Sequence, residues 1–364
     1  MEAIGAQAPG WHILQPTQQR SSLYGRLSLE WDYCMVHDHQ GAFTGSIGYV
    51  VADPMVQKTH WCNRFKLLPS GVSVAIAGMF ANGRKLANFI NFPFNNVQLS
   101  ANTKSLTAQD HNTHLWATLK VHPDGGLQLE GITQDIEYQL DILAAQPCLL
   151  PRDNAFTPVT GRDMGHLPNE QWTVDVIWPR ANVSGYIRDL NKNKTVEITG
   201  HGYRENAFGQ WLFWAGGWDF AVVSDHQSGV QWVWQTYHRS QELSYLDLSF
   251  PLDGVQKTVR FFAQTGQLQW QHQHWQFDPQ ARQKYPLDTT VYAHNQDYRV
   301  ETQLFIGKNQ VPLLYNNSWY TNIYVIFALF PFCKGAIYSV KEGTQLLKFS
   351  GQAGGEYSTL RSLF

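Results

Sequence analysis

The 364-residue chain is poor in cysteine, in charge and in long hydrophobic runs. Its four cysteines, Cys34, Cys62, Cys148 and Cys333, lie far apart and form no CxxC pair. This argues against a zinc knuckle or a dense disulfide framework, and it leaves buried free thiols as the expectation. The longest hydrophobic run, residues 323–333, includes a proline and is much shorter than the roughly 20 residues of a membrane-spanning helix. We therefore expect a buried strand or short helix there, and no transmembrane segment.

Charge is also sparse and nearly balanced. Asp, Glu, Lys and Arg make up 15% of the chain, and the formal net charge is -2 at pH 7. Without a long basic run the sequence carries no electrostatic footprint for DNA or RNA, so we expect no nucleic-acid partner. The amino-terminal residues do not show the basic segment followed by an apolar segment that marks a secretory signal, and we therefore expect a cytoplasmic location.

Several catalytic and cofactor motifs are missing. There is no GxSxG turn for a nucleophilic serine, and no GxGxxG or GxxxxGK(S/T) loop for a nucleotide. His272 and His274 stand two residues apart and, with His238 or His294, offer the residue types of a zinc site, but no carboxylate has matching spacing. A polar strand face accounts for the pair better. We expect neither a cofactor nor a bound metal ion.

Aromatic residues are abundant, with 14 Trp, 16 Tyr and 20 Phe. Helical periodicity is scarce, whereas short alternating runs separated by Gly, Pro, Asn and Asp recur throughout, a pattern typical of antiparallel sandwiches or barrels. Turn residues in 122–127 and 189–196 predict hairpins. The other predicted strands are 43–51, 72–80, 114–121, 127–133, 171–178, 185–190, 195–201, 210–214, 218–224, 244–250, 257–263, 298–306 and 336–342.

The length suggests two domains, since single cores seldom grow beyond about 250–300 residues. Residues 146–170 are rich in Pro, Gly and Asn, lack periodicity, and are the best candidate for a linker or crossover. We therefore predict an N-terminal β domain over residues 1–165 and a C-terminal β domain over residues 166–364.

Side chains alternate between the two faces of a strand, and this alternation assigns the residues of two further predicted strands to one face or the other. In 229–239, one face carries Val230, Trp232, Trp234, Thr236 and His238, which places the two indoles side by side. In 268–277, one face carries Trp270, His272 and His274, and Trp275 lies on the opposite face. Both faces are partly polar, as in a barrel strand with one wet side.

Residues 200–220, GHGYRENAFGQWLFWAGGWDF, gather seven aromatic rings around Arg204, Glu205 and Asp219. A buried core would exclude the Arg-Glu pair, and a solvated face would exclude the tryptophans. The composition is that of a small-molecule site, in which apolar side chains form most of the surface and a few polar groups are placed among them. Glu205 is then either a member of a surface ion pair or a hydrogen-bonding arm in a pocket, and Asp219 either caps a turn or acts as an acid.

Glu30 lies in a similar aromatic context. In residues 28–38, Glu30, Asp32 and Cys34 share one face, and the aromatic residues Trp31 and Tyr33 lie on the other. Glu30 and Asp32 form either a solvated edge or, if that face lines a cavity, a place where apolar neighbours raise the pKa of a carboxyl group that serves as a general acid.

The segment GHGYRENAFG (200–209) resembles the G-x-G-Y-H-D-H-N-W-G element of the carotenoid 1,2-hydratase (hydroxyneurosporene synthase) superfamily, which includes fungal Diels-Alderases and is similar to lipocalin-like proteins. Residues 28–54 are similar to its amino-terminal element and, more distantly, to that of tocopherol cyclases, and 351–358 to a Gly-rich closing segment. The resemblance spans most of the chain through short, degenerate elements. It implies an all-β fold of two antiparallel β domains, a β-sandwich and a lipocalin-like barrel, with few short helices and an apolar substrate between them or in the barrel mouth.

The sequence departs from this element at functional positions. Tyr203 agrees with it, Glu205 stands where Asp is usual, and Phe208 stands where Trp is usual. Arg204 and Asn206 replace its two histidines, which the resemblance makes proton donors in hydratases. Their loss weakens the case for water addition and favours a cyclase that acts by shape, hydrogen bonding to a carbonyl, and ring stacking.

The leading hypothesis is a cofactor-free cyclase of natural-product biosynthesis, such as a Diels-Alderase, that folds a flexible apolar polyene or polyketide-type molecule into a reactive conformer. The expected catalytic residues are Glu30, Tyr203, Glu205 and Asp219. The expected substrate-binding residues are Tyr33, Trp214, Trp218, Trp232, Trp234 and His238. Two alternatives stay open: a hydratase or protonation-driven isoprenoid or carotenoid cyclase, with Asp219 or Glu30 as the acid, and a lipid or pigment carrier without chemistry. The sequence indicates no oligomeric state.

Overall fold

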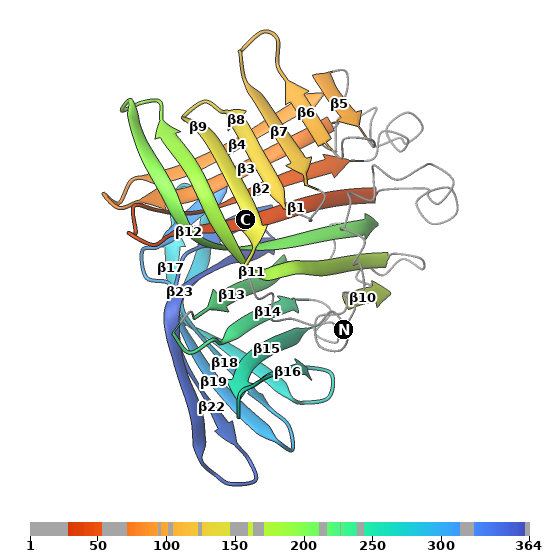
Figure 1. Ribbon diagram of the computed structural model, residues 1–364, viewed down its shortest axis with the longest axis vertical. Helices are drawn as coiled ribbons and strands as arrows, with labels where there is room; N and C mark the ends of the chain where they lie inside the picture. The colour runs from red at the N-terminus through yellow and green to blue at the C-terminus, as the bar shows by residue number, and fades with distance from the viewer. Residues whose placement is uncertain are drawn as a thin grey trace.

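The protein is an all-β molecule of two large antiparallel sheets (Figure 1). The structure, a computed structural model, describes residues 28–52, 71–93, 96–100, 105–122, 126–145, 159–162, 171–210, 217–225, 227–238, 244–313 and 324–360. Within these ranges the chain forms 23 strands and no α-helix. The predicted all-β class is confirmed.

The first sheet contains the first twelve strands. Its strands are β1 (Ser28–Asp38), β2 (Phe43–Ala52), β3 (Gly71–Phe80), β4 (Lys85–Pro93), β5 (Val97–Ser100), β6 (Ser105–Gln109), β7 (Trp116–Val121), β8 (Leu127–Ile132), β9 (Ile136–Ala144), β10 (Val159–Arg162), β11 (Gln171–Asp189) and β12 (Lys194–Gln210). The order is β4-β3-β2-β1-β12-β11-β9-β8-β7-β6-β5, and β10 pairs with β11. The pairing of β12 with β1 joins the two halves of the sheet.

The second sheet contains the remaining eleven strands. They are β13 (Gly217–Ser224), β14 (Gln231–Tyr237), β15 (Tyr245–Leu252), β16 (Val255–Phe262), β17 (Leu268–Asp278), β18 (Gln283–His294), β19 (Tyr298–Phe305), β20 (Gln310–Leu313), β21 (Tyr324–Leu329), β22 (Phe332–Ser339) and β23 (Gln345–Leu360). The main order is β16-β15-β14-β13-β23-β22-β19-β18-β17, with β21 pairing both β20 and β23. The last strand therefore lies in the middle of its sheet.

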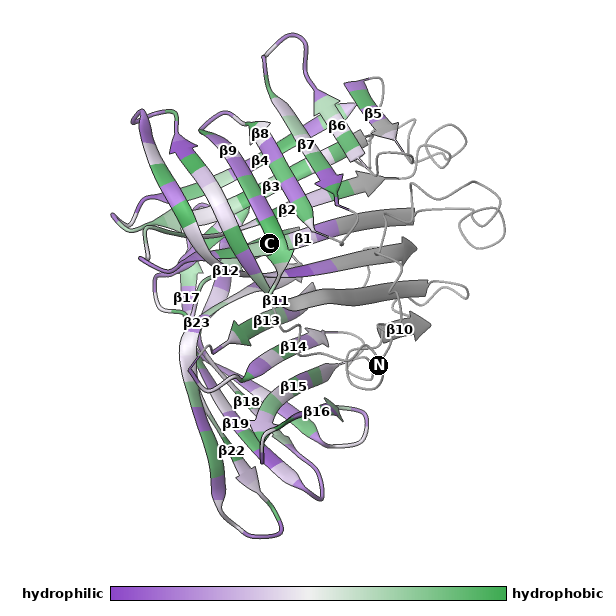
Figure 2. Cartoon of the chain, viewed as in Figure 1, coloured by the Kyte–Doolittle hydropathy of each residue, from purple (hydrophilic) through white to green (hydrophobic). Residues whose placement is uncertain are grey.

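Alternating side chains explain why these segments form strands. In β4 and β8 every second residue is buried, so that one face packs on the core and the other meets solvent. Figure 2 shows this alternation as stripes along the strands of both sheets. In β13 and β14, by contrast, nearly every residue is buried. These two strands are therefore covered on both faces, as expected for strands near a contact between the sheets.

The first sheet curls around its own hydrophobic core. Inside it, the Tyr49 hydroxyl in β2 donates to the Thr118 carbonyl oxygen at 3.0 Å and shares a hydrogen bond with the Tyr138 hydroxyl at 2.8 Å. These contacts join β2 to β7 and β9, which are not its neighbours in the sheet. The interior is mostly aliphatic, with residues such as Val74, Leu119 and Leu140 fully buried.

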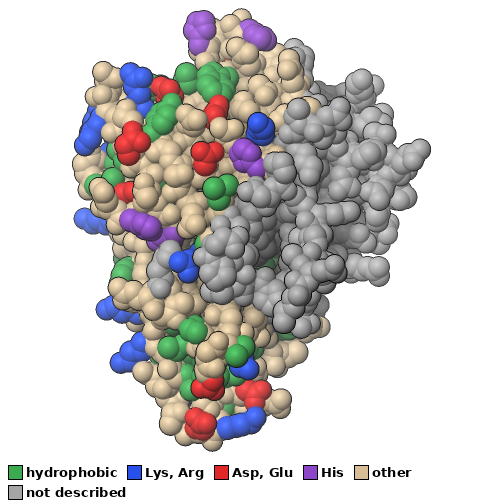
Figure 3. Space-filling view, viewed as in Figure 1, with side chains coloured by type: hydrophobic (Ala, Val, Ile, Leu, Met, Phe, Trp, Pro, Cys, Tyr) green, Lys and Arg blue, Asp and Glu red, His purple; other side chains and the backbone are tan. Residues whose placement is uncertain are grey.

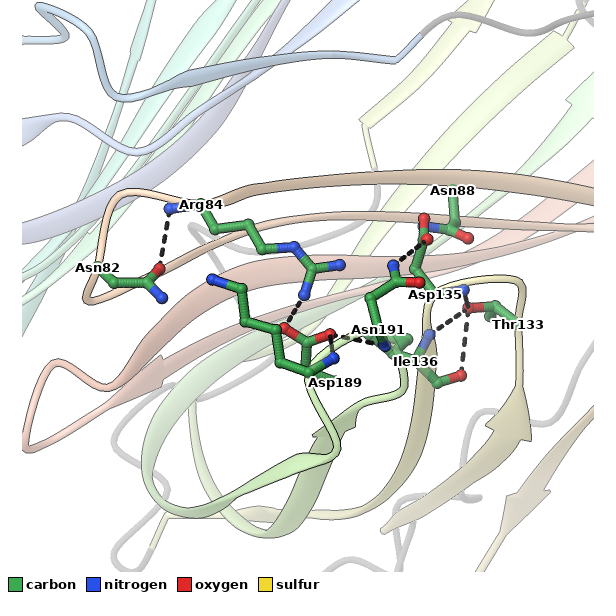
Figure 4. Close-up of polar contacts among 9 residues, drawn as sticks. Asn82, Arg84, Asn88, Thr133, Asp135, Ile136, Asp189 and Asn191 are labelled. Atoms are coloured by element: carbon green, nitrogen blue, oxygen red, sulfur yellow. Dashed lines mark hydrogen bonds and ion pairs between the residues drawn. The ribbon is translucent and has the colours of Figure 1, made fainter.

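Polar turns close one end of this sheet (Figure 4). Arg84, in the turn before β4, forms an ion pair with Asp189 at the end of β11. Asp135, in the turn between β8 and β9, accepts hydrogen bonds from Asn88 at 2.9 Å and from Asn191 at 2.7 Å. Three turns that are far apart in the sequence are thereby held together, and the edge strand β4 lies over the rest of the sheet.

Most of the predicted strands are present. The segments 171–178 and 185–190 belong to one long strand, β11, and 323–333 contains β21 and the start of β22. The hairpins predicted at 122–127 and 189–196 connect β7 to β8 and β11 to β12. Cys34 and Cys333 are buried free thiols, as predicted, whereas Cys62 and Cys148 lie outside the described residues.

The chain passes from the first sheet to the second between β12 and β13. The predicted linker 146–170 is described only at β10, which is part of the first sheet, and β11 and β12 also belong to that sheet. The predicted division of the chain into domains at residue 165 stays a prediction; the change from the first sheet to the second comes after β12.

The charged side chains are dispersed. On the face in Figure 3, acidic and basic side chains are interspersed over both sheets. Among the residues that the structure describes, no helix is long and apolar enough to span a membrane.

Candidate functional site

Polar and aromatic side chains gather where the two sheets meet. Tyr33 in β1 and Glu205 in β12 are register partners. Phe220 in β13 of the second sheet packs against Tyr33 and Tyr203, with ring centroids 6.0 Å and 5.4 Å away. Tyr33, Tyr203, Glu205, Trp218, Phe220 and Glu356 form what we call the intersheet cluster. The predicted residues Tyr33, Tyr203, Glu205 and Trp218 thus come together.

Tyr203 and Glu205 form a buried pair. The Tyr203 hydroxyl donates to Glu205 Oε2 at 2.7 Å, and the two residues are 1% and 6% exposed. Burial, and then the charge of Glu205, hold the pKa of Tyr203 well above its ordinary value. Tyr203 is therefore a neutral phenol that orients the carboxyl group of Glu205.

Arg204 does not pair with Glu205. Its guanidinium points to the other side of β12 and forms two hydrogen bonds with the carboxylate of Asp32, at 3.1 and 2.7 Å. Both side chains are about 1% exposed. The alternatives of a surface ion pair for Glu205 and of a solvated edge at Asp32 are therefore wrong: Glu205 is buried and bound to Tyr203, and Asp32 is half of a buried salt bridge.

Glu356 in β23 is the carboxyl group that the sequence interpretation missed. The Trp218 indole N–H donates to its Oε2 at 3.0 Å. Burial raises the pKa of Glu356 to about 7, against the opposing effects of Trp218 and the nearby Tyr33 hydroxyl. The Tyr33 hydroxyl is itself buried and makes no hydrogen bond of good geometry within the described part of the chain. Near pH 7 the Glu356 carboxyl group therefore exchanges between its protonated and ionised forms, and in the protonated form it is a donor beside the Tyr33 phenol.

The predicted residue Asp219 lies on the opposite face of β13, inside the second sheet. Its Oδ2 lies 3.2 Å from Nε2 of both His238 and His272. Nδ1 of His272 lies 2.9 Å from the Thr289 hydroxyl. Burial works against ionisation of Asp219, but the two imidazoles outweigh it and hold its pKa below its ordinary value. Asp219 is thus an ionised carboxylate fixed between two rings, and the predicted turn cap is wrong.

A small hollow lies inside the second sheet, beside Asp219 and His272. Its lining includes Asp219, Phe220, Trp234, His272, Leu304 and Glu356. Its volume of ≈ 10 Å³ leaves room for about one water molecule. Ligand pockets usually have about 300–1,000 Å³, so a substrate needs a wall of this hollow to move. The side chain of Glu356, the register partner of Phe220, lies on the opposite face of the sheet from Asp219, so the two carboxyl groups do not share this hollow.

The predicted tryptophans have different surroundings. Trp232 and Trp234 lie side by side in β14, with ring centroids 6.3 Å apart, inside the core of the second sheet. Their indole nitrogens are buried and have no hydrogen-bond partner among the described residues.

Glu30 pairs with Phe208 and Val51 in the first sheet, but its side chain lies outside the described part. Trp214 lies outside the described residues.

The faces of β17 are only partly as predicted. Trp270 and His272 both contact the Trp234 ring, at 6.1 and 6.4 Å. His274, however, faces solvent and binds Asp288 at 2.7 Å, while Trp275 contacts the His272 ring at 5.5 Å. The predicted sides of His274 and Trp275 are therefore wrong, because the backbone at His274 is left-handed, with φ 51°. Among the described residues no group of three His, Cys, Asp or Glu side chains is arranged to hold a metal ion.

One signal for Glu356 was present in the sequence. It is the lone charged residue in GQAGGEYS (351–358), as Glu205 is one of few charged residues in an aromatic run. Its partner Phe220 in β13 lies far away in the sequence, and only this pairing brings it to the site.

Comparison with known proteins finds similarity in structure. No protein-family model matches the chain, and no curated protein matches it. The solved structure of CghA with Sch210972 aligns at a TM-score of 0.60 and 10% identity, over 98% of this chain and 94% of that chain. A protein provisionally assigned as AttH from Nitrosomonas europaea aligns at 0.58 and 13%, over 92% and 93%.

Kievitone hydratase from Nectria haematococca aligns at a TM-score of 0.55 and 9% identity, over 97% of this chain and 94% of that chain. At such identities the likeness establishes the fold alone. The chain shares the fold of these proteins over nearly its whole length, as the resemblance at residues 200–209 implied.

Proposed function

We propose that the protein is an enzyme, a cyclase or a hydratase, that activates a hydrophobic small molecule with the neutral carboxyl group of Glu356. The observation that carries this proposal is a buried glutamic acid with a pKa of about 7 at the contact between the sheets. An acid whose pKa lies near the working pH is the most effective proton donor, and a neutral carboxyl group also donates a strong hydrogen bond to a carbonyl oxygen.

The surroundings of Glu356 suit a cyclase. Tyr33 and the Glu205–Tyr203 pair place further polar groups beside it, and Trp218 and Phe220 supply aromatic surface. Donors fixed in a buried site stabilise charge that develops on a substrate carbonyl without having to reorganise. Glu205 and Tyr203, predicted from the sequence as catalytic, would serve as the hydrogen-bonding arm, and Glu356 as the acid. The resemblance of residues 200–209 to a superfamily that includes Diels-Alderases supports this assignment.

The test compares Glu356→Gln and Glu205→Gln with Glu301→Gln, a half-exposed surface control. Each variant is incubated with a panel of polyenes, polyketides and flavonoids, and the products are analysed by mass spectrometry. We expect a product from the wild type and the control, and a loss of about 100-fold or more in Glu356→Gln, the usual range for a general acid. Equal turnover in all variants would remove both glutamates from the mechanism. Recovery of unchanged compound in a stoichiometric complex would support a carrier instead.

A hydratase is the second candidate, favoured by the second carboxyl group of the intersheet cluster. Glu205 lies on the same side as Glu356, because its register partner Tyr33 and its hydrogen-bond partner Tyr203 both pack against Phe220, the register partner of Glu356. In such a reaction Glu356 would protonate one alkene carbon, a water oxygen would bond to the other, and Glu205 would accept the proton that the water loses. Reaction in heavy water separates the candidates: a hydratase adds one water and places deuterium on carbon, whereas a pericyclic closure leaves mass and carbon-bound hydrogens unchanged.

A further inference from the structure

Trp275 contacts two aromatic rings close to Asp219, those of His272 and Tyr357, and the three rings also contact one another. Its ring centroid lies 5.5 Å from His272 and 5.7 Å from Tyr357, and His272 and Tyr357 are 5.8 Å apart. All three contacts are edge-to-face. His272 also lines the hollow and binds Asp219. Trp275 is thus the outer ring of an aromatic cluster whose inner ring borders the hollow.

The inward position of Trp275 depends on the backbone of β17. In a regular strand, residues three apart point to opposite faces, yet Trp275 meets His272. The left-handed conformation of His274 (φ 51°) accounts for this, because it interrupts the alternation just before Trp275. The His274 side chain is held outside by Asp288 at 2.7 Å. The chain therefore uses an unfavourable conformation to turn an indole toward the interior.

Trp275 is also the least restrained of the three rings. It is 46% exposed, whereas Tyr357 is 7% exposed and the His272 side chain is bound at both nitrogens, to Asp219 and Thr289. Moreover, β17 is the edge strand of its sheet. Rotation of this one side chain into solvent would uncover a face of His272 and of Tyr357 without moving the sheet.

We propose that the indole of Trp275 is a gate, and that a flat, conjugated part of the ligand takes its place. The small volume of the hollow supports this proposal, since a substrate needs a wall to move. A planar unsaturated group restores the ring contacts of Tyr357 and His272 that the indole gives up, whereas a saturated group of the same size does not. The inference concerns the hollow beside Asp219 and His272 and goes beyond the proposed function, whose acid Glu356 lies on the other face of β13 and β23.

The test measures binding of 2-naphthol and of its saturated counterpart decahydro-2-naphthol by calorimetry. Trp275→Ala is compared with Phe277→Ala, which removes another exposed ring from the same strand. We expect Trp275→Ala to bind 2-naphthol about tenfold more tightly than the wild type, with little gain for the saturated compound. Phe277→Ala should bind both compounds as the wild type does. In Trp275→Ala, adding Tyr357→Leu should abolish the gain.

Other results would overturn the gate. Equal affinities of Trp275→Ala and the wild type for 2-naphthol would do so, as would equal gains for both compounds, because the latter indicate a loosened core. A gain that survives Tyr357→Leu would place the binding elsewhere. The measurement is of binding and not of turnover, so this test can succeed or fail independently of whether Glu356 is the catalytic acid.

Discussion

Glu356 and Asp219 are both buried carboxyl groups, yet their surroundings act on them in opposite directions. Glu356 receives a hydrogen bond from the neutral Trp218 indole, which offsets only part of the cost of burial, so its pKa rises to about 7. Asp219 has two imidazoles as partners, and they more than offset that cost. The number and kind of hydrogen-bond partners, rather than depth of burial, therefore decide which group holds a proton.

The raised pKa of Glu356 predicts a pH dependence of stability. Unfolded, this group titrates near 4.5; folded, it keeps its proton up to about 7. Its contribution to the free energy of unfolding is therefore fully present below pH 4.5 and is lost as the pH rises through 7, a change of about 3 kcal/mol. Glu356→Gln cannot titrate and lacks this loss.

Urea unfolding of the wild type and Glu356→Gln at several pH values between 4 and 8 measures this difference. The comparison is necessary because Asp247, whose pKa burial also raises to about 7, contributes in the same direction in both proteins. A wild-type free energy that runs parallel to that of the variant across this range would show that Glu356 titrates normally.

At this scale the sequence predicts part of the site. Glu205 could be identified as a candidate because a charged residue within an aromatic run is unusual and indicates a specific role. The same holds for Asp219. The direction in which Arg204 points could not, since its partner Asp32 lies 172 residues away. Nor could the role of Glu356, whose setting arises only when β23 returns to pair with β13.

At the scale of strands, the period of two is reliable where the backbone is regular. It correctly places Trp232 and Trp234 of β14, and His238 directly after it, on one face, which is the interior face. It fails in β17, where one left-handed residue exchanges the sides of His274 and Trp275. It also divides β11 into two strands, because register shifts between Val176 and Ala181 interrupt the pattern without ending the strand. Local conformations of this kind carry no clear signal in a single sequence.

The strand β17 offers a direct test of this backbone. His274→Gly and His274→Val both remove the hydrogen bond to Asp288, but only glycine adopts a positive φ without cost. We expect His274→Val to be less stable than His274→Gly by about 1–2 kcal/mol, the cost of a left-handed residue with a side chain. Thermal or urea unfolding of the two variants measures this difference. Equal stabilities would mean that the strand can straighten freely at this position.

At the scale of the whole molecule, the two sheets make one site because their central strands meet. β1 and β12 lie in the middle of the first sheet, and β13 and β23 in the middle of the second. The all-β class and the presence of two large sheets follow from the sequence pattern. The point where the chain passes from one sheet to the other does not, because β11 and β12 alternate as strands of either sheet would, and only long-range pairing assigns them.

Close packing between the sheets predicts a sensitive position at Gly354 in β23. A Cβ atom there would collide with Met35 Sδ of β1, whereas at Gly351 in the same strand the nearest atom outside the strand is 4.0 Å away. Neither glycine has a positive φ, so substitution tests space and not backbone conformation. We expect Gly354→Leu to lower the free energy of unfolding by about 1–3 kcal/mol through overpacking, and Gly351→Leu to change it by less than about 0.5 kcal/mol. Urea unfolding of both variants measures this contrast, and equal effects would show that the sheets are free to separate at β1 and β23.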